Sequence, residues 1–225
     1  MKKPRVLVAM TSHSTKGDTG ERTGAYLPEI AHPYDVFARA GLDVDFASVA
    51  GGRVPLDGAD GKDPLLAPFQ PGGPLEGRLL DSLPASAVDP ARYDAVFFAG
   101  GHGTMWDFAD CEAFAKVAAA IHEKGGVVSA VCHGPAALVN VKLSSGAWLV
   151  AGKTVSAFTN EEERAVKLDR VVPFLLEDKL VERGAVVETA PKWQAKVVVD
   201  GRLVTGQNPA SAAGVAREVA RLLGA

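Results

Sequence analysis

Short, continuous apolar runs alternate with amphipathic stretches along most of the chain. Apolar runs bounded by glycine or polar residues occur at residues 5–10, 44–49, 95–99 and 126–131. Runs of this length without an alternating polar face predict strands that are buried on both faces of a sheet. Amphipathic stretches with helical spacing lie at residues 33–40 and 111–124, and a glycine follows each of them.

The second half of the chain continues this alternation. We expect a strand at residues 154–158, helices near 161–167 and 172–183, and a closing amphipathic helix at 210–223. Asp200 and Gly201 separate apolar runs at 196–199 and 202–205, a pattern typical of an antiparallel hairpin. Strands that alternate with helices predict an α/β sandwich of the flavodoxin-like kind. It would have a mostly parallel central sheet, helices on both faces and the antiparallel hairpin at one edge.

Residues 51–90 interrupt the pattern, because glycine, proline and aspartate dominate there. We interpret this segment as an excursion over the surface, part of which could serve as a lid, rather than as a second domain. The chain of 225 residues has the length of one ordinary domain. We therefore expect residues 1–225 to form a single domain.

The composition is that of a soluble globular protein, with 47% hydrophobic and 23% charged residues. The net charge of −3 comes from charges of both signs scattered along the chain, which argues against nucleic acid and against a membrane surface as partners. No apolar run is long enough for a membrane-spanning helix or a signal peptide. The two cysteines, Cys111 and Cys132, are too few for a disulfide scaffold. We therefore expect a cytoplasmic protein, in which a well-placed cysteine is a candidate nucleophile.

The segment GVVSAVCHGPAAL at residues 126–138 places Cys132 between a predicted strand and a predicted helix. A nucleophile on such a turn is held above the sheet, with the N-terminus of the next helix directed at it. That position favours the thiolate, which predicts a low pKa for Cys132. His133 follows directly and can pair with the sulfur. The alternative is a buried structural cysteine, but the complete Cys-His-Gly-Pro turn favours the nucleophile.

Two further strand-to-helix turns are unusual, and ligands of open α/β sheets bind at the carboxyl ends of the strands. The glycine-rich run at residues 100–103 lets backbone N–H groups approach a ligand closely. With the amide of His133, Gly101 could form an oxyanion hole; alternatively this is a plain glycine turn. Glu29 follows the first strand at the start of a helix. Its alternative role is that of an ordinary acidic residue at a helix N-terminus.

The remaining histidines, aromatic residues and second cysteine have structural interpretations. Trp106 follows the glycine run and is either a wall of the pocket or a core residue, and Trp193 is expected in the core. Cys111 begins an amphipathic helix and is expected to be a small packed hydrophobic residue. No metal site is expected, because three histidines lack the spacing of metal ligands: His13, His32 and His122.

Four segments in this order resemble the ThiJ/PfpI superfamily, whose members have a class I glutamine amidotransferase-like fold. They are AVCHGPAAL, FAGGHGTMWD, GAYLPEIAHPYDVFARAGLDVDFAS and LVTGQNPASA. The resemblance extends over essentially the whole chain. The most similar branch is that of the glutathione-independent glyoxalases (glyoxalase III), whose members are also described as stress-induced chaperones.

The resemblance implies roles for four residues. Cys132 would be the nucleophile and His133 its base partner, while Glu29 would be a protonated carboxyl group beside the sulfur. The third member of the triad would be an acid after the VSAFT segment, and Glu163 fits best. The three consecutive glutamates leave this register open by one residue, to Glu162. The spacing from Asn160 to Glu163 is also that of a helix capping box, which would give Glu163 a purely structural role.

The implied activity is conversion of methylglyoxal or a similar 2-oxoaldehyde to a 2-hydroxy acid such as D-lactate, through a cysteine hemithioacetal and without a metal or organic cofactor. Gly101, His133 and Trp106 would contact the substrate. Protein deglycase or chaperone activity could accompany this reaction, and the resemblance suggests a homodimer. Two alternatives stay open: a cysteine peptidase or amidase with the same triad, and a holdase chaperone without essential catalysis.

Overall fold

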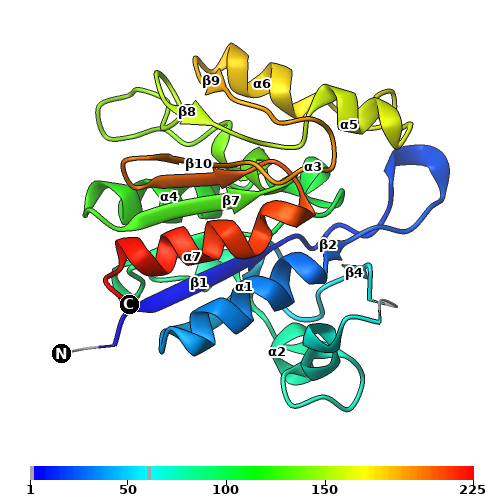
Figure 1. Ribbon diagram of the computed structural model, residues 1–225, viewed down its shortest axis with the longest axis vertical. Helices are drawn as coiled ribbons and strands as arrows, with labels where there is room; N and C mark the ends of the chain where they lie inside the picture. Colours follow the sequence, from blue (N-terminus) through cyan, green and yellow to red (C-terminus); the bar gives the residue numbers. More distant parts are fainter. Residues whose placement is uncertain (1–2, 60–61) are drawn as a thin grey trace.

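The computed structural model, which describes residues 3–59 and 62–225, is built around a seven-stranded sheet (Figure 1). The strands lie in the order β10-β11-β7-β6-β1-β3-β5. Every neighbouring pair is parallel except β10 and β11, which form an antiparallel hairpin at one edge. The strands are β1 (Arg5–Met10), β3 (Asp43–Ser48), β5 (Leu83–Pro84), β6 (Ala95–Phe98), β7 (Val127–Val131), β10 (Val197–Asp200) and β11 (Leu203–Gly206).

The central strands are buried on both faces, as their continuous apolar runs predict. In β1, Val6, Val8 and Met10 belong to one hydrophobic cluster, and Leu7 and Ala9 belong to the other. This division follows from the alternation of side chains along a strand. Each face of the sheet therefore has a core of its own.

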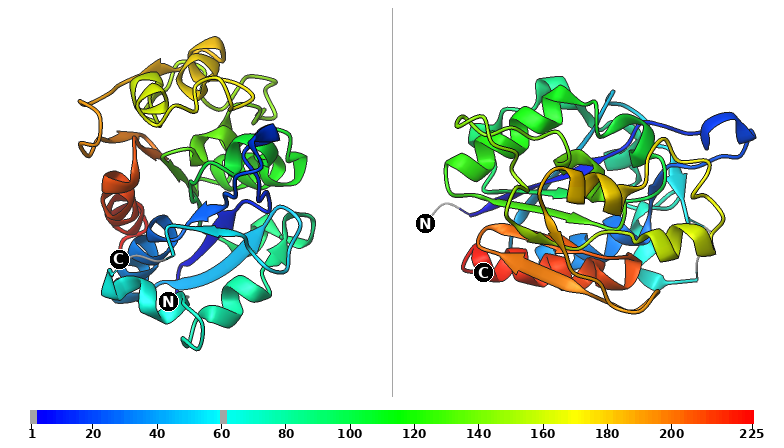
Figure 2. Two further views of the ribbon diagram at one scale, coloured as in Figure 1. Left: turned by 90° about the vertical axis from the view of Figure 1, so that its right-hand side faces the viewer. Right: turned by 90° about the horizontal axis from the view of Figure 1, so that it is seen from above.

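Helices cover both cores (Figure 2). On one face, α1 (Pro28–Arg39) and α7 (Ala212–Leu222) pack side by side and bury Phe37 and Val219. On the other face, α4 (Glu112–Glu123) buries Phe114 and Ile121. The predicted fold class, a mostly parallel sheet between helices with an antiparallel edge, is confirmed.

Shorter elements surround the sheet and carry parts of the site. Two small parallel pairs are formed by β2 (Ala25–Tyr26) with β4 (Leu56–Asp57), and by β8 (Thr154–Val155) with β9 (Val186–Val187). The short helices are α2 (Glu76–Leu80), α3 (Thr104–Asp107), α5 (Asn160–Ala165) and α6 (Leu176–Glu182). The strand expected at 154–158 ends early because the chain turns toward the sheet, where Phe158 N–H donates to the carbonyl of Cys132 at 2.9 Å.

The described residues of the segment at 51–90 form several short elements that its composition does not suggest. It contains β4, α2 and a 3₁₀ turn at Pro64–Phe69, and its strand β5 forms the edge of the central sheet beside β3. Leu66, Phe69 and Leu79 are buried and anchor it against the core beneath α1. Along the described residues, no helix combines the length and the apolar character needed to cross a membrane.

Candidate active site

Cys132 stands on a strained turn at the carboxyl end of β7. Its backbone has a φ of 61°, a left-handed conformation that is unfavourable for a residue with a Cβ. The turn is held from two sides, because Cys132 N–H donates to the carbonyl of Gly206 and its own carbonyl accepts from Phe158 N–H, both at 2.9 Å. The element that follows is a five-residue 3₁₀ helix, Gly134–Leu138. The helix expected from the sequence after this turn is therefore a short 3₁₀ helix.

His133 lies between the sulfur and a carboxylate. Its Nδ1 is 3.4 Å from Cys132 Sγ, and its Nε2 is 2.7 Å from Oε2 of Glu163. A neutral imidazole has one N–H and one lone pair, so an Nε2–H bond to the carboxylate leaves the lone pair of Nδ1 facing the sulfur. Burial, together with the nearby ring of His102, lowers the pKa of His133 to about 4. The ring is therefore neutral near pH 7 and can accept a proton from the thiol.

Glu163 reaches His133 because the capping of α5 uses a different glutamate. The N-cap residue is Thr159, and its hydroxyl accepts the N–H of Glu162 while the Glu162 carboxylate accepts the N–H of Thr159, both at 3.1 Å. The capping box expected from Asn160 to Glu163 is therefore wrong by one residue. Glu163 is left to point at the site, where its side chain is only 4% exposed.

His102 also belongs to this cluster, although the sequence pattern indicated only the glycine-rich run that contains it. Its Nε2 lies 2.9 Å from Oε1 of Glu163, so each oxygen of this carboxylate meets one histidine. The ring centroids of His102 and His133 are 4.1 Å apart. Burial by itself would raise the pKa of Glu163, but the hydrogen bonds from the two histidines outweigh it and hold the pKa at about 2.

Glu29 is completely buried in the first turn of α1. Neither of its carboxyl oxygens has a hydrogen-bond partner of regular geometry within the described residues. Burial raises the pKa of Glu29 to about 8, and its interactions with Cys132 and the backbone of Gly100 only partly oppose this. A Cβ on Gly100 would collide with Oε2 of Glu29 and would lie 2.9 Å from Cβ of Cys132. Glycine is therefore required where the glycine run passes between these side chains.

The pKa of Cys132 is raised, whereas the sequence analysis predicted a low one. Burial raises it most, and the Glu29 carboxyl adds to the effect. The backbone N–H groups of His133 and Gly101 oppose the shift without overcoming it. The prediction was wrong because it assumed an exposed sulfur before a full helix. The cysteine is instead 4% exposed and followed by a short 3₁₀ helix.

The predicted oxyanion donors lie beside the sulfur, since the amides of Gly101 and His133 both interact with the thiol. Gly101 has a φ of +106° and packs against the backbone of residues 24–26, so only glycine fits this turn.

The two tryptophans occupy different surroundings. Trp106 stacks on His13 with ring centroids 5.2 Å apart, and both rings line a cavity of about 720 Å³ together with Arg170. A role for Trp106 in substrate binding stays a prediction. Trp193 was expected in the core but is 48% exposed. Its ring contacts Phe158 at a centroid distance of 5.9 Å, and Phe158 in turn packs on His133 at 4.3 Å.

The residues given structural interpretations lie away from the sulfur. Cys111 is half-buried at the start of α4, where burial raises its pKa. His32 bonds to Asp63 at 2.5 Å, and burial lowers the pKa of His122.

His102, His133 and Glu163 could also be read as metal ligands, because one ligand atom from each lies within 4.8 Å of the other two. Both histidine nitrogens, however, already form short hydrogen bonds to the carboxylate. The arrangement of these three side chains therefore fits hydrogen bonds between the histidines and the carboxylate better than a metal ion.

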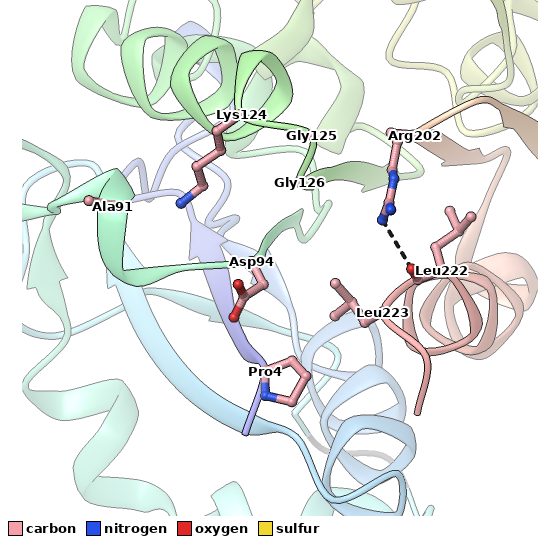
Figure 3. A pocket seen from close by; sticks show the side chains of 9 residues that line it. All are labelled: Pro4, Ala91, Asp94, Lys124, Gly125, Gly126, Arg202, Leu222 and Leu223. Atoms are coloured by element: carbon pink, nitrogen blue, oxygen red, sulfur yellow. Dashed lines mark hydrogen bonds between the residues drawn. The ribbon is translucent and has the colours of Figure 1, made fainter. Parts of the chain in front are cut away.

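Another cavity, of about 460 Å³, lies at the opposite end of the sheet (Figure 3). Its lining includes Pro4, Asp94, Gly126 and Arg202, which precede the amino ends of β1, β6, β7 and β11. Arg202 donates to the carbonyl of Leu222 at 3.0 Å across the cavity wall. Cys132 lies at the carboxyl end of β7, so this cavity is remote from the cluster around the sulfur.

The sequence of this chain matches a known protein family. The model of the DJ-1/PfpI family matches residues 23–222. The chain belongs to the DJ-1/PfpI family. Within this family it is 34% identical over 228 residues to Glyoxalase 3 of Candida albicans, and the match covers 96% of each chain. The resemblance to the ThiJ/PfpI superfamily and its glyoxalase III branch is thereby confirmed.

Solved structures of family members extend the similarity to the fold. Glyoxalase III of Candida albicans superimposes with a TM-score of 0.87 and 32% identity, over 97% of both chains. The Rapid Encystment Protein 24 KDa of Francisella tularensis superimposes with a TM-score of 0.94 and 39% identity, over 98% of this chain and 99% of that one. The fold is thus shared with these two proteins over nearly the whole chain.

Proposed function

We propose that this protein is a glutathione-independent glyoxalase that converts a 2-oxoaldehyde such as methylglyoxal to the 2-hydroxy acid. The observation that carries the proposal is the arrangement of Cys132, His133 and Glu163. A thiol, a neutral imidazole and a carboxylate are linked in series at 3.4 and 2.7 Å. The relatives named as glyoxalases cover nearly the whole chain and support the same reaction class.

The first step is addition of the thiol to the aldehyde carbon. Nδ1 of His133 accepts the thiol proton while Sγ bonds to the carbon, and return of this proton to the former carbonyl oxygen gives a hemithioacetal. Glu163 accepts a hydrogen bond from Nε2–H and stabilises the imidazolium that forms. The amides of Gly101 and His133 donate to the oxygen on which negative charge develops. This role needs a neutral His133, in agreement with its lowered pKa.

The second step moves hydrogen within the substrate. His133, neutral again once the hemithioacetal has formed, removes the proton from the former aldehyde carbon. It delivers a proton to the neighbouring carbon, whose carbonyl becomes the alcohol. The product of this isomerisation is a thioester of the 2-hydroxy acid. Glu29, which is buried beside the sulfur and keeps its proton up to about pH 8, would exchange protons with the substrate oxygens. Water then cleaves the thioester, which releases the acid and restores the thiol, so no external oxidant or reductant is needed.

The test is turnover of methylglyoxal in the absence of glutathione, with lactate measured by enantiomer-specific enzymatic assay. We expect the wild-type protein to form D-lactate, the Cys132→Ser variant to be inactive, and the matched control Cys111→Ser to retain activity. Equal turnover by wild-type and Cys132→Ser proteins would overturn the proposal. Peptidase and amidase substrates, assayed in parallel, test the hydrolytic alternative that shares the triad. Aggregation suppression by Cys132→Ser tests whether chaperone activity is independent of the cysteine.

A further inference from the structure

The chemistry above uses one oxygen of Glu163, and the structure shows what holds the other. His102 lies in the glycine-rich run between β6 and α3, and its Nε2 is 2.9 Å from Oε1 of Glu163. Its side chain is 17% exposed, and the carboxylate is nearly buried. A carboxylate in such a place needs a partner for each oxygen. The two histidines together provide these partners.

The position of His102 is fixed independently of Glu163. The hydroxyl of Thr104 lies 2.9 Å from the carbonyl oxygen of Gly101 and 3.1 Å from that of His133, so it ties the glycine run to the turn at Cys132. The His102 ring packs against His133, at a centroid distance of 4.1 Å, and meets Phe158 in an edge-on contact at 5.9 Å. The backbone and these two neighbouring rings therefore restrict its orientation before any substrate binds.

We propose that His102 is a positioning residue of this site, which acts through Glu163. By donating to Oε1 it fixes the plane of the carboxylate, so that Oε2 is directed at Nε2 of His133 and the lone pair of Nδ1 is directed at Cys132. The expected effect of His102 on turnover rests on the proposed function. The positioning of Glu163 by His102 does not, because it concerns the protein without substrate.

A second consequence is electrostatic. The titratable groups that face His133 are Cys132 on its own turn, His102 from the glycine run, and Glu163 with Glu162 from α5. Burial lowers the pKa of His133 most, and His102 is the next largest influence in the same direction. The two glutamates raise this pKa. Removing the His102 ring should therefore raise the pKa of His133, because the remaining neighbours stabilise the imidazolium.

Two variants separate these effects. His102→Gln keeps an N–H donor for Glu163 but cannot carry a positive charge, whereas His102→Ala removes both. We expect turnover near neutral pH to fall on the order of tenfold or more in His102→Ala, as for loss of a group that orients a reacting histidine. In His102→Gln most of this turnover should be retained. His122→Gln, on α4 and away from the cluster, is the matched control and should behave as the wild type.

A second measurement is the titration of His133 by NMR in protein with labelled histidine, which tests the electrostatic consequence and requires no turnover. The pKa of His133 is about 4 in the wild-type protein, and it should rise by about one unit in both His102 variants. The acid limb of kcat/KM should move to higher pH by the same amount. Wild-type turnover in His102→Ala would overturn the proposal. A tenfold loss of turnover in folded His102→Gln, which keeps the donor to Glu163, would overturn it as well, even if His102→Ala failed to fold. A shifted titration without methylglyoxal turnover would retain it and reject the proposed function instead.

Discussion

Glu162 and Glu163 are neighbours in the first turn of α5, and their buried carboxylates bind different groups. Glu163 bonds to the two histidines of the candidate site. Oε1 of Glu162 accepts from Trp193 N–H and from the side-chain amides of Gln207 and Asn208, at 2.9, 3.1 and 2.8 Å. One glutamate therefore belongs to the candidate site, and the other joins α5 to the segments around β10 and β11. Two substitutions that are chemically identical should have different effects.

We expect Glu163→Gln to lower turnover by roughly 10³–10⁴-fold, the size of the effect when the carboxylate of a catalytic triad becomes an amide. The amide can present an N–H to Nε2 of His133 and so favour the wrong tautomer. Steady-state kinetics with methylglyoxal measures the loss, and circular dichroism checks that the fold is intact. Turnover within threefold of the wild type would contradict the assignment of Glu163.

Glu162→Gln should mainly destabilise the protein. An amide NH2 in place of one carboxylate oxygen faces other N–H donors, which leaves buried donors without acceptors at a cost of roughly 3 kcal/mol in the free energy of unfolding. Chemical denaturation measures this change. At temperatures where the variant is folded, its turnover should stay close to that of the wild type. A large loss of turnover in a fully stable variant would instead move the triad register to Glu162.

Glu29 should make the protein less stable as the pH rises. The ordinary pKa of a glutamate is 4.5, and burial raises that of Glu29 to about 8. The folded state thus holds this proton where the unfolded state has lost it. The corresponding stability is complete below pH 4.5 and is lost as the pH rises toward 8, with a total on the order of a few kcal/mol. Thermal unfolding at a series of pH values measures it.

The matched control for this prediction is Glu29→Gln, which should lack the loss on the alkaline side. It should keep the loss on the acid side that His133 causes, because burial lowers that pKa from 6.5 to about 4. Stability then falls as the pH drops through this range. Parallel profiles for the wild type and Glu29→Gln between pH 5 and pH 8 would show that Glu29 ionises normally.

Removal of metal ions should not change turnover. The nitrogens of His102 and His133 that could bind a metal are hydrogen-bonded to Glu163, and the proposed steps use only protons and the thiol. Dialysis against a chelator, followed by the methylglyoxal assay, provides the measurement. Loss of activity that returns when one metal is added back would mean that the three residues act as ligands.

Local patterns predicted the architecture well. Continuous apolar runs are decisive for a parallel sheet, and the strands at 5–10 and 95–98 were placed within one residue. The excursion at 51–90 was harder to predict, because its order comes from buried contacts of Leu66 and Leu79 with a distant core. Contacts of that kind leave no periodic signal in the sequence.

The positions of the candidate site residues were predictable where they follow from the order of strands and turns. They were not predictable where they depend on burial. Cys132 and Gly101 follow the carboxyl ends of β7 and β6, and Glu29 lies in the first turn of α1, the first α-helix after β1. The topology of the sheet brings these ends together. His102 was missed as a side chain because its importance depends on a glutamate 61 positions away. The direction of the Cys132 pKa was wrong because burial of the sulfur and of Glu29 is a property of the whole fold.

The left-handed backbone of Cys132 lowers the stability of the fold at the residue whose thiol the proposed reaction needs. Such a conformation costs a residue with a side chain on the order of 1 kcal/mol or more, and glycine adopts it freely. A glycine at position 132 would relax this backbone and abolish the thiol in the same step. Screening for thermal stability alone would therefore favour replacement of the proposed nucleophile. A cysteine at φ 61° is informative for that reason, since the backbone by itself would favour glycine there.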